Sequence, residues 1–234
     1  MKKDKETRRL GDKETALPEP SPCLPLSLSP CLLRGAIILC GGRGTRMGRD
    51  KASLPFGAEA LLQRILRIVT DAVAVERIVC IAAQDQELPS LPTGVRVFRD
   101  PLPDCGPLAG LATGLRVLAD EVDAAFVCGC DVPLLAPQFI ERIFESLGEH
   151  QVAAVRDDER TYPLPAVYRA SVLPAAESLL AAGDRSLMAL VERCETHFVF
   201  ADRMRDFDPD LRSLAACNTP EEYDRALRQV FPAG

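Results

Sequence analysis

The sequence contains no tryptophan and only three tyrosines among its 234 residues, and its formal net charge at pH 7 is −6. Nucleic-acid-binding proteins usually present a basic surface with aromatic side chains on which bases stack. This composition therefore argues against a nucleic-acid partner. The chain also lacks any apolar run approaching the ~18 residues that a membrane-spanning helix requires, so no membrane segment is expected.

The nine cysteines include no Cys-x-x-Cys pair, and Cys128-Gly129-Cys130 has too few companion ligands for a structural zinc site. Several cysteines lie in apolar stretches, where a free thiol behaves as a small hydrophobic group. Because reduced thiols are usual in the cytoplasm, we expect unpaired cysteines in a cytoplasmic protein. The two histidines, His150 and His197, lie outside every motif, and we expect them to be structural.

Residues 1–34 differ in composition from the rest of the chain. Met1–Thr15 is charged and unpatterned, and Pro18–Pro30 contains five prolines. The prolines interrupt the apolar stretch that a signal peptide needs, and such a composition cannot bury a core. We expect residues 1–34 to be a disordered extension and residues 35–234 to form a single domain.

From Gly35 onward, short apolar runs alternate with segments of helical periodicity. Residues 36–40 form a continuous apolar run ended by glycines, which is typical of a strand buried on both faces. Further strands are expected at 77–82, 95–98, 124–128, 152–155, 166–168 and 196–200, and helices near 61–69, 108–118, 139–147, 172–182, 186–193 and 220–230. This alternation predicts an α/β fold with a Rossmann-like open, mostly parallel sheet and helices on both faces.

Ligands of such sheets bind beyond the carboxyl ends of the strands, and the turn after the first strand is rich in glycine and basic residues. It reads Leu39-Cys-Gly-Gly-Arg-Gly-Thr-Arg-Met-Gly-Arg-Asp-Lys51, with Arg43, Arg46, Arg49 and Lys51 within nine residues. Glycines let the backbone approach a ligand, and successive N–H groups bind anions. On an acidic chain, this concentration of positive charge predicts a phosphate site.

Two common phosphate-binding loops do not fit this turn. A P-loop requires a Gly-Lys pair, and none occurs here. A dinucleotide-binding loop requires Gly-x-Gly-x-x-Gly leading directly into a helix, whereas Gly42, Gly44 and Gly48 are spaced one residue too widely and Pro55 delays the helix. A third pattern, Leu39-x-Gly-Gly-x-x-x-Arg-Met-Gly-x-x-Lys51, resembles the loop of nucleotidyltransferases, which activate a phosphate with a nucleoside triphosphate. The alternative is a surface loop with incidental basic residues.

Two acidic residues follow later strands. Asp131, in Cys130-Asp-Val-Pro133, is a lone carboxylate suited to Mg²⁺, which prefers one or two carboxylates together with substrate phosphates. Asp131 could instead cap the following helix. Asp100 precedes Gly106-Pro-Leu-Ala-Gly110, a segment that taken alone is an ordinary strand-to-helix turn.

Together, these motifs resemble the molybdenum cofactor guanylyltransferases, a family of Rossmann-like nucleotidyltransferases with a sheet of the nucleotide-diphospho-sugar-transferase type. The resemblance covers residues 35–230. It rests on the loop Leu39–Lys51, Gly106–Gly110, Cys130–Pro133, Pro165-Ala-Val-Tyr168-Arg and Asn218-Thr-Pro-Glu-Glu222, in that order.

The resemblance implies transfer of GMP from GTP to the terminal phosphate of molybdopterin, with release of pyrophosphate. It also implies Mg²⁺ as cofactor, and molybdoenzymes or their chaperones as recipients of the product. The residues it implicates are Leu39, Cys40, Gly41 and Gly42 for backbone contact with the nucleotide, Lys51 and Arg46 for the phosphates, Asp100 for the nucleotide, Asp131 for Mg²⁺ and Asn218 for the acceptor.

The sequence departs from the family in two places. After the second strand, the family often has an asparagine near the nucleotide, but this chain has Ala82-Ala83-Gln84. Before Thr-Pro the family often has two asparagines, and here Ala216 replaces the first. Asn218 could therefore either contact the pterin or cap the final helix.

Other functions share parts of this pattern. A molybdopterin cytidylyltransferase, or an enzyme that activates a sugar phosphate or a cobalamin precursor, could carry the same glycine-rich loop. A non-catalytic nucleotide-binding module is an alternative of a different class. The presence of both Lys51 and Asp131 argues against such a module.

Overall fold

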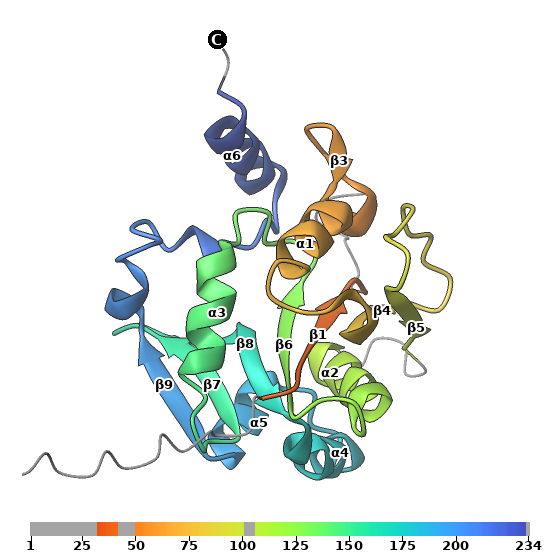
Figure 1. The fold of residues 1–234 in the computed structure, drawn as a ribbon, viewed down its shortest axis with the longest axis vertical. Helices are drawn as coiled ribbons and strands as arrows, with labels where there is room; N and C mark the ends of the chain where they lie inside the picture. Colours follow the sequence, from red (N-terminus) through yellow and green to blue (C-terminus); the bar gives the residue numbers. More distant parts are fainter. Residues whose placement is uncertain (1–31, 42–49, 101–105, 233–234) are drawn as a thin grey trace, which may run out of the picture. The chain divides into compact units, whose positions relative to one another are not determined.

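A computed structural model describes residues 32–41, 50–100 and 106–232 (Figure 1). Its centre is a seven-stranded sheet in the order β5-β4-β1-β6-β8-β7-β9. The strands are β1 Arg34–Leu39, β4 Ile78–Ala82, β5 Arg96–Arg99, β6 Ala124–Gly129, β7 Val152–Arg156, β8 Thr161–Arg169 and β9 Thr196–Phe200. Only β8 in this sheet runs antiparallel to its neighbours, so the predicted, mostly parallel sheet is confirmed.

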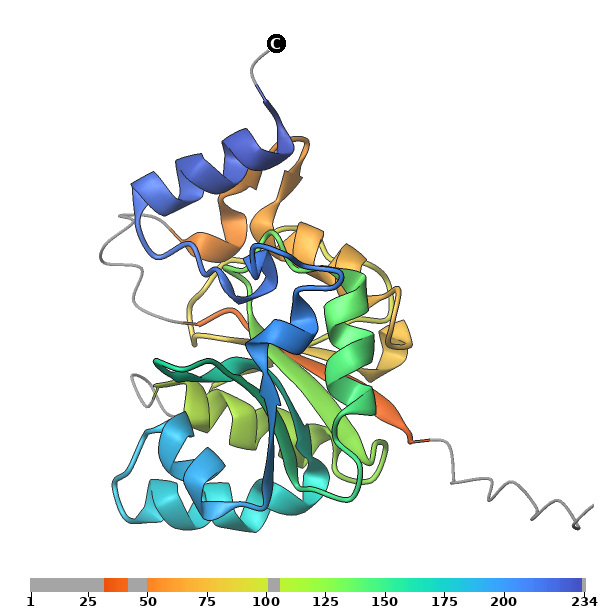
Figure 2. The ribbon, with the colours of Figure 1, turned by 90° about the vertical axis from the view of Figure 1, so that its left-hand side faces the viewer.

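Helices cover both faces of the sheet, as predicted (Figures 1 and 2). The α-helices are α1 Leu61–Val69, α2 Gly106–Leu118, α3 Pro137–Glu145, α4 Leu173–Ala181, α5 Leu187–Arg193 and α6 Pro220–Val230. Short 3-10 helices are η1 Lys51–Ser53, η2 Val75–Arg77, η3 Ala170–Val172, η4 Ala201–Met204 and η5 Arg212–Leu214. Helices α1 and α3 pack on one face, and α2, α4 and α5 on the other. No helix within the described part of the chain is long and apolar enough to cross a membrane.

Both faces of strand β1 are buried, which explains why its sequence is continuously apolar. Alternate residues of a strand point to opposite faces, and here Ile38 is buried in the core beneath α1 and α3 while Ile37 and Leu39 are buried beneath α2. A Cβ atom added to Gly110 of α2 would lie 2.8 Å from Leu39, and one added to Gly114 would lie 2.7 Å from Ile37. These glycines therefore allow α2 to pack closely against β1, next to the predicted phosphate site.

A small hairpin, which the sequence analysis did not predict, follows η1. It consists of β2 Pro55–Phe56 and β3 Glu59–Ala60, so α1 begins after it. The hairpin packs against the C-terminal helix α6 (Figure 2). The ring of Phe56 lies 6.2 Å from that of Tyr223 and 5.7 Å from that of Phe231, measured between centroids. This apolar cluster joins the segment after Lys51 to the C-terminal end of the chain.

The described part of the chain begins just before β1. The backbone N–H of Leu33 donates a hydrogen bond to Asp123 Oδ2 at 2.8 Å, and the backbone N–H of Asp123 donates to the Leu33 carbonyl at 2.8 Å. Arg34 forms an ion pair with Glu141 of α3. Residues immediately before Gly35 therefore contribute to the packed domain.

Candidate active site

A cleft opens at the carboxyl edge of the sheet, where β1 and β6 end. The chain runs from β1 outward to β4 and β5 and then returns to β6 on the other side of β1. In open α/β sheets, ligands bind at such a reversal of strand order. The cleft has a volume of about 410 Å³, and its lining includes Leu39, Cys40, Gly41, Lys51, Pro107, Gly129, Cys130, Asp131, Val132, Leu164, Leu214, Ala216 and Asn218.

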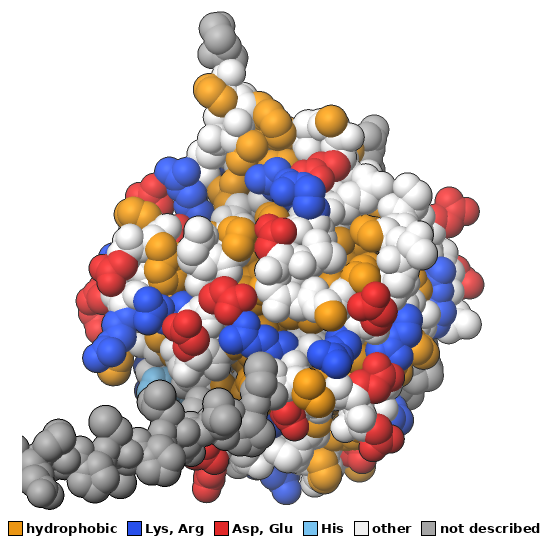
Figure 3. All heavy atoms as spheres, in the orientation of Figure 1, with side chains coloured by type: hydrophobic (Ala, Val, Ile, Leu, Met, Phe, Trp, Pro, Cys, Tyr) orange, Lys and Arg blue, Asp and Glu red, His pale blue; other side chains and the backbone are white. Residues whose placement is uncertain are grey.

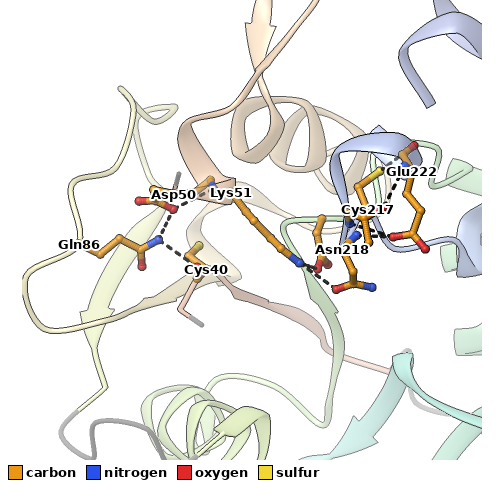
Figure 4. A network of polar contacts seen from close by, with 10 residues as sticks. Cys40, Asp50, Lys51, Gln86, Cys217, Asn218 and Glu222 are labelled. Carbon is orange, nitrogen blue, oxygen red and sulfur yellow. Dashed lines mark hydrogen bonds and ion pairs between the residues drawn. The ribbon is translucent and has the colours of Figure 1, made fainter. Parts of the chain in front are cut away.

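Three predicted residues from distant parts of the sequence meet in this cleft. Lys51 Nζ, from η1, lies 2.8 Å from Asp131 Oδ2, just beyond β6, and 2.9 Å from Asn218 Oδ1, just before α6 (Figure 4). The side chains of Lys51 and Asp131 are each 21% exposed. A charge-assisted hydrogen bond in such a partly desolvated setting is stronger than one on the open surface. We call Lys51, Asp131 and Asn218 the charged triad.

Local structure holds Asp131 in place. Its backbone carbonyl accepts a hydrogen bond of 2.7 Å from the Cys217 N–H, which joins the end of β6 to the segment before α6. A Cβ atom on Gly129 would lie 2.3 Å from Asp131 Oδ1. The glycine therefore leaves the space that the carboxylate occupies.

The structure corrects one of the two interpretations of Asn218. Thr219, and not Asn218, is the N-cap of α6, because its hydroxyl accepts a hydrogen bond from the Glu222 N–H. Glu222 Oε2 in turn accepts hydrogen bonds from the backbone N–H groups of Asn218 and Thr219. The Asn218 side chain is therefore available to accept the hydrogen bond from Lys51, a role that no local pattern in the sequence indicates.

The backbone after β1 lies against β4. The N–H groups of Cys40 and Gly41 both donate to the Ile81 carbonyl, at 2.8 and 3.3 Å. A Cβ atom on Gly41 would lie 3.3 Å from the backbone nitrogen of Ala83, so glycine permits this close approach. Because these two N–H groups already have a partner, contact between Leu39–Gly41 and a nucleotide stays a prediction.

The sequence also implicates Gly42, Arg46 and Asp100. Gly42 and Arg46 fall outside the described residues, so their expected phosphate contacts stay predictions. Asp100 follows β5, and its N–H donates to the Ala82 carbonyl at 2.8 Å. One strand, β4, lies between β5 and β1, and Asp100 is not among the residues that line the cleft.

Residues 36–197 match the family model described as the MobA-like NTP transferase domain. The chain belongs to this family. A relative from Methanosarcina mazei named "Probable molybdenum cofactor guanylyltransferase" is 34% identical over 204 residues, which cover 83% of this chain and 90% of the relative. A relative of the same name from Mycobacterium tuberculosis is 37% identical over 187 residues, covering 78% and 88% of the two chains.

Solved structures of low sequence identity share the fold of this MobA-like chain. Molybdopterin-guanine dinucleotide biosynthesis protein A from Archaeoglobus fulgidus has a TM-score of 0.69 at 22% identity, covering 84% of this chain and 98% of the other. A Mycobacterium tuberculosis protein solved in complex with manganese has a TM-score of 0.59 at 16% identity, covering 85% and 99%. The expected nucleotide-diphospho-sugar-transferase type of sheet is thereby confirmed, and the family is one of nucleotidyltransferases.

The side chains available as metal ligands in this MobA-like site suit a metal ion that is also bound by the substrate. Among the described residues, no group of three or more His, Cys, Asp or Glu side chains could hold a metal ion. Asp131 contributes a single carboxylate to the cleft, and the Lys51 ammonium lies against one of its oxygens. One carboxylate with phosphate oxygens is the set that Mg²⁺ commonly accepts, whereas a resident metal site needs more protein ligands.

The thiols near Asp131 are poor nucleophiles. Burial, followed by the nearby Asp131 carboxylate, raises the pKa of Cys130 well above its usual value. The same two causes, with Glu222 as a third, raise the pKa of Cys217 to about 12. Both thiols stay neutral near pH 7, and the six cysteines in the described ranges are free, as predicted. The His150 and His197 rings contact each other, with centroids 5.1 Å apart, and do not line the cleft.

Charge on the molecular surface is mixed. Figure 3 shows Lys and Arg side chains interspersed with Asp and Glu on the face seen in Figure 1. Ion pairs of the described chain include Arg34 with Glu141 and Arg142 with Glu145 of α3. Among the described residues that line the cleft, the charged side chains are Lys51 and Asp131, which form an ion pair.

Proposed function

We propose that this protein transfers GMP from GTP to the terminal phosphate of molybdopterin, forming the guanine dinucleotide cofactor and pyrophosphate. The observation that carries the proposal is the charged triad, in which Lys51 and Asp131 meet in a cleft at the reversal of strand order. The relatives that share most of the chain's length and are named as guanylyltransferases support the choice of nucleotide and acceptor.

The reaction needs no nucleophile from the protein. An oxygen of the acceptor phosphate attacks the α-phosphorus of GTP, the bond to the bridging oxygen breaks, and pyrophosphate leaves with that electron pair. The protein therefore acts by positioning the two substrates and stabilising negative charge. This requirement agrees with the neutral thiols near Asp131 and with a cationic group facing the cleft.

Lys51 is the described cation best placed for the phosphates. An ammonium group has three N–H donors, and Asp131 and Asn218 accept from it in the structure. One donor is thus left for a phosphate oxygen, and we propose that it stabilises the leaving pyrophosphate. We assign Arg46 to the same task and Gly41 with Gly42 to backbone contact with the nucleotide.

We assign the Mg²⁺ site to Asp131. Bound there with the triphosphate, the ion would neutralise charge on the reacting phosphates. Gly129 keeps the Asp131 carboxylate in the cleft, and Lys51 balances its charge. Asp100, beyond β5, is proposed to contact the nucleoside part of GTP.

We place the acceptor on the side of the cleft formed by Leu164, Leu214, Ala216 and Asn218. The Asn218 amide uses its oxygen to accept from Lys51, which leaves its NH₂ group to donate to the acceptor. We further propose that the reaction takes place in the cytoplasm, in keeping with the free thiols. A molybdoenzyme or its chaperone would then receive the product.

The test incubates the protein with Mg²⁺, each of the four nucleoside triphosphates and one acceptor at a time, either molybdopterin, a sugar phosphate or a cobalamin precursor, and identifies the product by mass spectrometry. We expect the guanine dinucleotide and stoichiometric pyrophosphate. A cytosine dinucleotide would instead assign a cytidylyltransferase. Nucleotide binding without turnover of molybdopterin, a sugar phosphate or a cobalamin precursor would assign a non-catalytic module, and either result would overturn the proposal.

A further inference from the structure

Gln86, in the turn after β4, bridges two positions of the chain that flank residues 41–49. Its Nε2 group donates hydrogen bonds to the Cys40 carbonyl at 3.0 Å and to Asp50 Oδ1 at 2.7 Å (Figure 4). Its Oε1 atom accepts a hydrogen bond of 3.0 Å from the Ala83 N–H. Both N–H donors of the amide and one lone pair of its oxygen are therefore in use, so the orientation of the amide is fixed.

The turn that carries Gln86 is itself held in place. Arg99, the last residue of β5, donates from Nη1 to the Ala83 carbonyl at 2.9 Å and to the Gln86 carbonyl at 2.6 Å. The Gln86 N–H also donates to the Ala83 carbonyl, at 3.2 Å. The side chain of Gln86 thus projects from a backbone that is anchored to two neighbouring strands.

Asp50 transmits this restraint to Lys51. The Asp50 Oδ1 atom that accepts from Gln86 also accepts from the Ala52 N–H at 3.0 Å, and Asp50 is the N-cap of η1. Lys51 is the first residue of η1. Holding Asp50 therefore holds the first turn from which the Lys51 side chain reaches Asp131.

We infer that Gln86 is a positioning residue that ties the end of β1 to the start of η1 and so prepares Gly41 and Lys51 for the triphosphate. This inference rests on the proposed function, which assigns those two residues to the nucleotide. Without the bridge, both positions must be ordered when GTP binds, and the lost conformational entropy weakens binding. The acceptor side, which Gln86 does not contact, should be unaffected.

The test compares Gln86→Ala and Gln86→Glu with Gln229→Glu. Gln229 is an exposed residue of α6 that does not line the cleft, so the control introduces the same charge without breaking the bridge. The GTP dissociation constant is measured by calorimetry, kcat and both KM values by pyrophosphate release, and folding by thermal unfolding. For Gln86→Ala we expect the dissociation constant and KM for GTP to rise about 10-fold, the scale of one to two lost hydrogen bonds. The KM for molybdopterin and the melting temperature should change little.

Gln86→Glu adds a pH-dependent signature. The introduced carboxylate would face Asp50, and this like charge would weaken the bridge most strongly at about pH 8. Protonation of the introduced carboxyl, whose pKa the neighbouring carboxylate raises, restores one donor. GTP affinity of this variant, relative to wild type, should therefore recover as the pH falls to about 5, whereas Gln229→Glu should follow wild type throughout.

The outcomes separate this inference from the proposed function. If the wild-type protein neither binds GTP nor releases pyrophosphate, both are overturned. If the wild type is active and the Gln86 variants match Gln229→Glu in GTP affinity and pH profile, the inference alone is overturned. A lowered melting temperature with equal losses for both substrates would assign a merely structural role to Gln86 and would also overturn it.

Discussion

The substitution Asp131→Asn keeps the shape of the side chain in the charged triad and removes its negative charge. In the structure, that charge lies 2.8 Å from Lys51 Nζ, and both side chains are 21% exposed. At an effective dielectric constant of about 20, two unit charges at this distance attract by roughly 6 kcal/mol before desolvation is counted. Desolvation cancels much of this, and hydrogen bonds to charged groups contribute about 1.5–3 kcal/mol net. Since the amide oxygen still accepts from Lys51, we expect the free energy of unfolding to fall by only about 1–2 kcal/mol.

Turnover should respond more strongly than stability. Loss of one major electrostatic group of an active site typically lowers kcat by about 100-fold or more, equivalent to about 2.7 kcal/mol or more of transition-state stabilisation. The proposed role of Asp131 in holding Mg²⁺ leads to a second expectation. The Mg²⁺ concentration needed for half-maximal rate should rise in the variant. The assay follows pyrophosphate release from GTP and molybdopterin across a Mg²⁺ series, and urea unfolding reports stability.

The control for this experiment is Glu121→Gln. Glu121 pairs with Arg96 at the same distance of 2.8 Å but does not line the cleft, and its side chain is 42% exposed. Exposed pairs contribute about 0–1 kcal/mol, so this variant should lose little stability and keep its turnover and Mg²⁺ dependence. Near wild-type turnover of Asp131→Asn at saturating Mg²⁺ would refute the role of Asp131. A loss of activity fully explained by unfolding would refute it as well.

Three further predictions test the surroundings of the triad. Gly129→Ala should displace the Asp131 carboxylate, since the added Cβ would lie 2.3 Å from Oδ1. We expect turnover to fall by about 10-fold or more while the melting temperature stays almost unchanged. Unchanged kinetics would count against the site. Asn218→Ala should lower turnover and raise KM for the acceptor. Its free energy of unfolding should change by less than about 0.5 kcal/mol, because Thr219 provides the cap of α6. A larger loss of stability with normal kinetics would contradict this prediction. A chain that starts at Leu32 should keep wild-type activity and melting temperature by calorimetry, and a marked drop would show that residues 1–31 support the domain.

Much of the sheet could be predicted because its strands carry their own signal. The continuous apolar run of β1 indicates burial on both faces, and in the structure a layer of helices covers each face of this strand. The direction of β8 could not be predicted, since a short apolar segment such as 166–168 has the same composition in either orientation. The β2–β3 hairpin has two residues in each strand, too few for any periodicity to appear.

The sequence predicts the residues of the charged triad but not the hydrogen bonds that connect them. Asp131 comes directly after β6, so its place at the carboxyl edge follows from the parallel sheet. Lys51 begins η1, well beyond the end of β1 at Leu39, so the structure was needed to show that it reaches Asp131. The hydrogen bond between Lys51 and Asn218 joins residues 167 positions apart, and it depends on how the last segment crosses the sheet. Gln86 is a polar residue in a turn, where such residues are common, and only the tertiary structure shows what its amide contacts.

The route of the C-terminal segment explains why one asparagine can reach Lys51. The hydrogen bond between the Cys217 N–H and the Asp131 carbonyl sets the register of this segment against the end of β6. The packing of α6 on the hairpin after η1 sets its direction. Neighbouring Cα atoms lie 3.8 Å apart, so a slip of one residue would carry the Asn218 amide beyond hydrogen-bonding distance of the ammonium. The placement of Asn218 therefore depends on one backbone contact and one apolar cluster. Ala216, which lines the cleft two residues before Asn218, has no side-chain amide, so Asn218 supplies the one amide among the described lining residues.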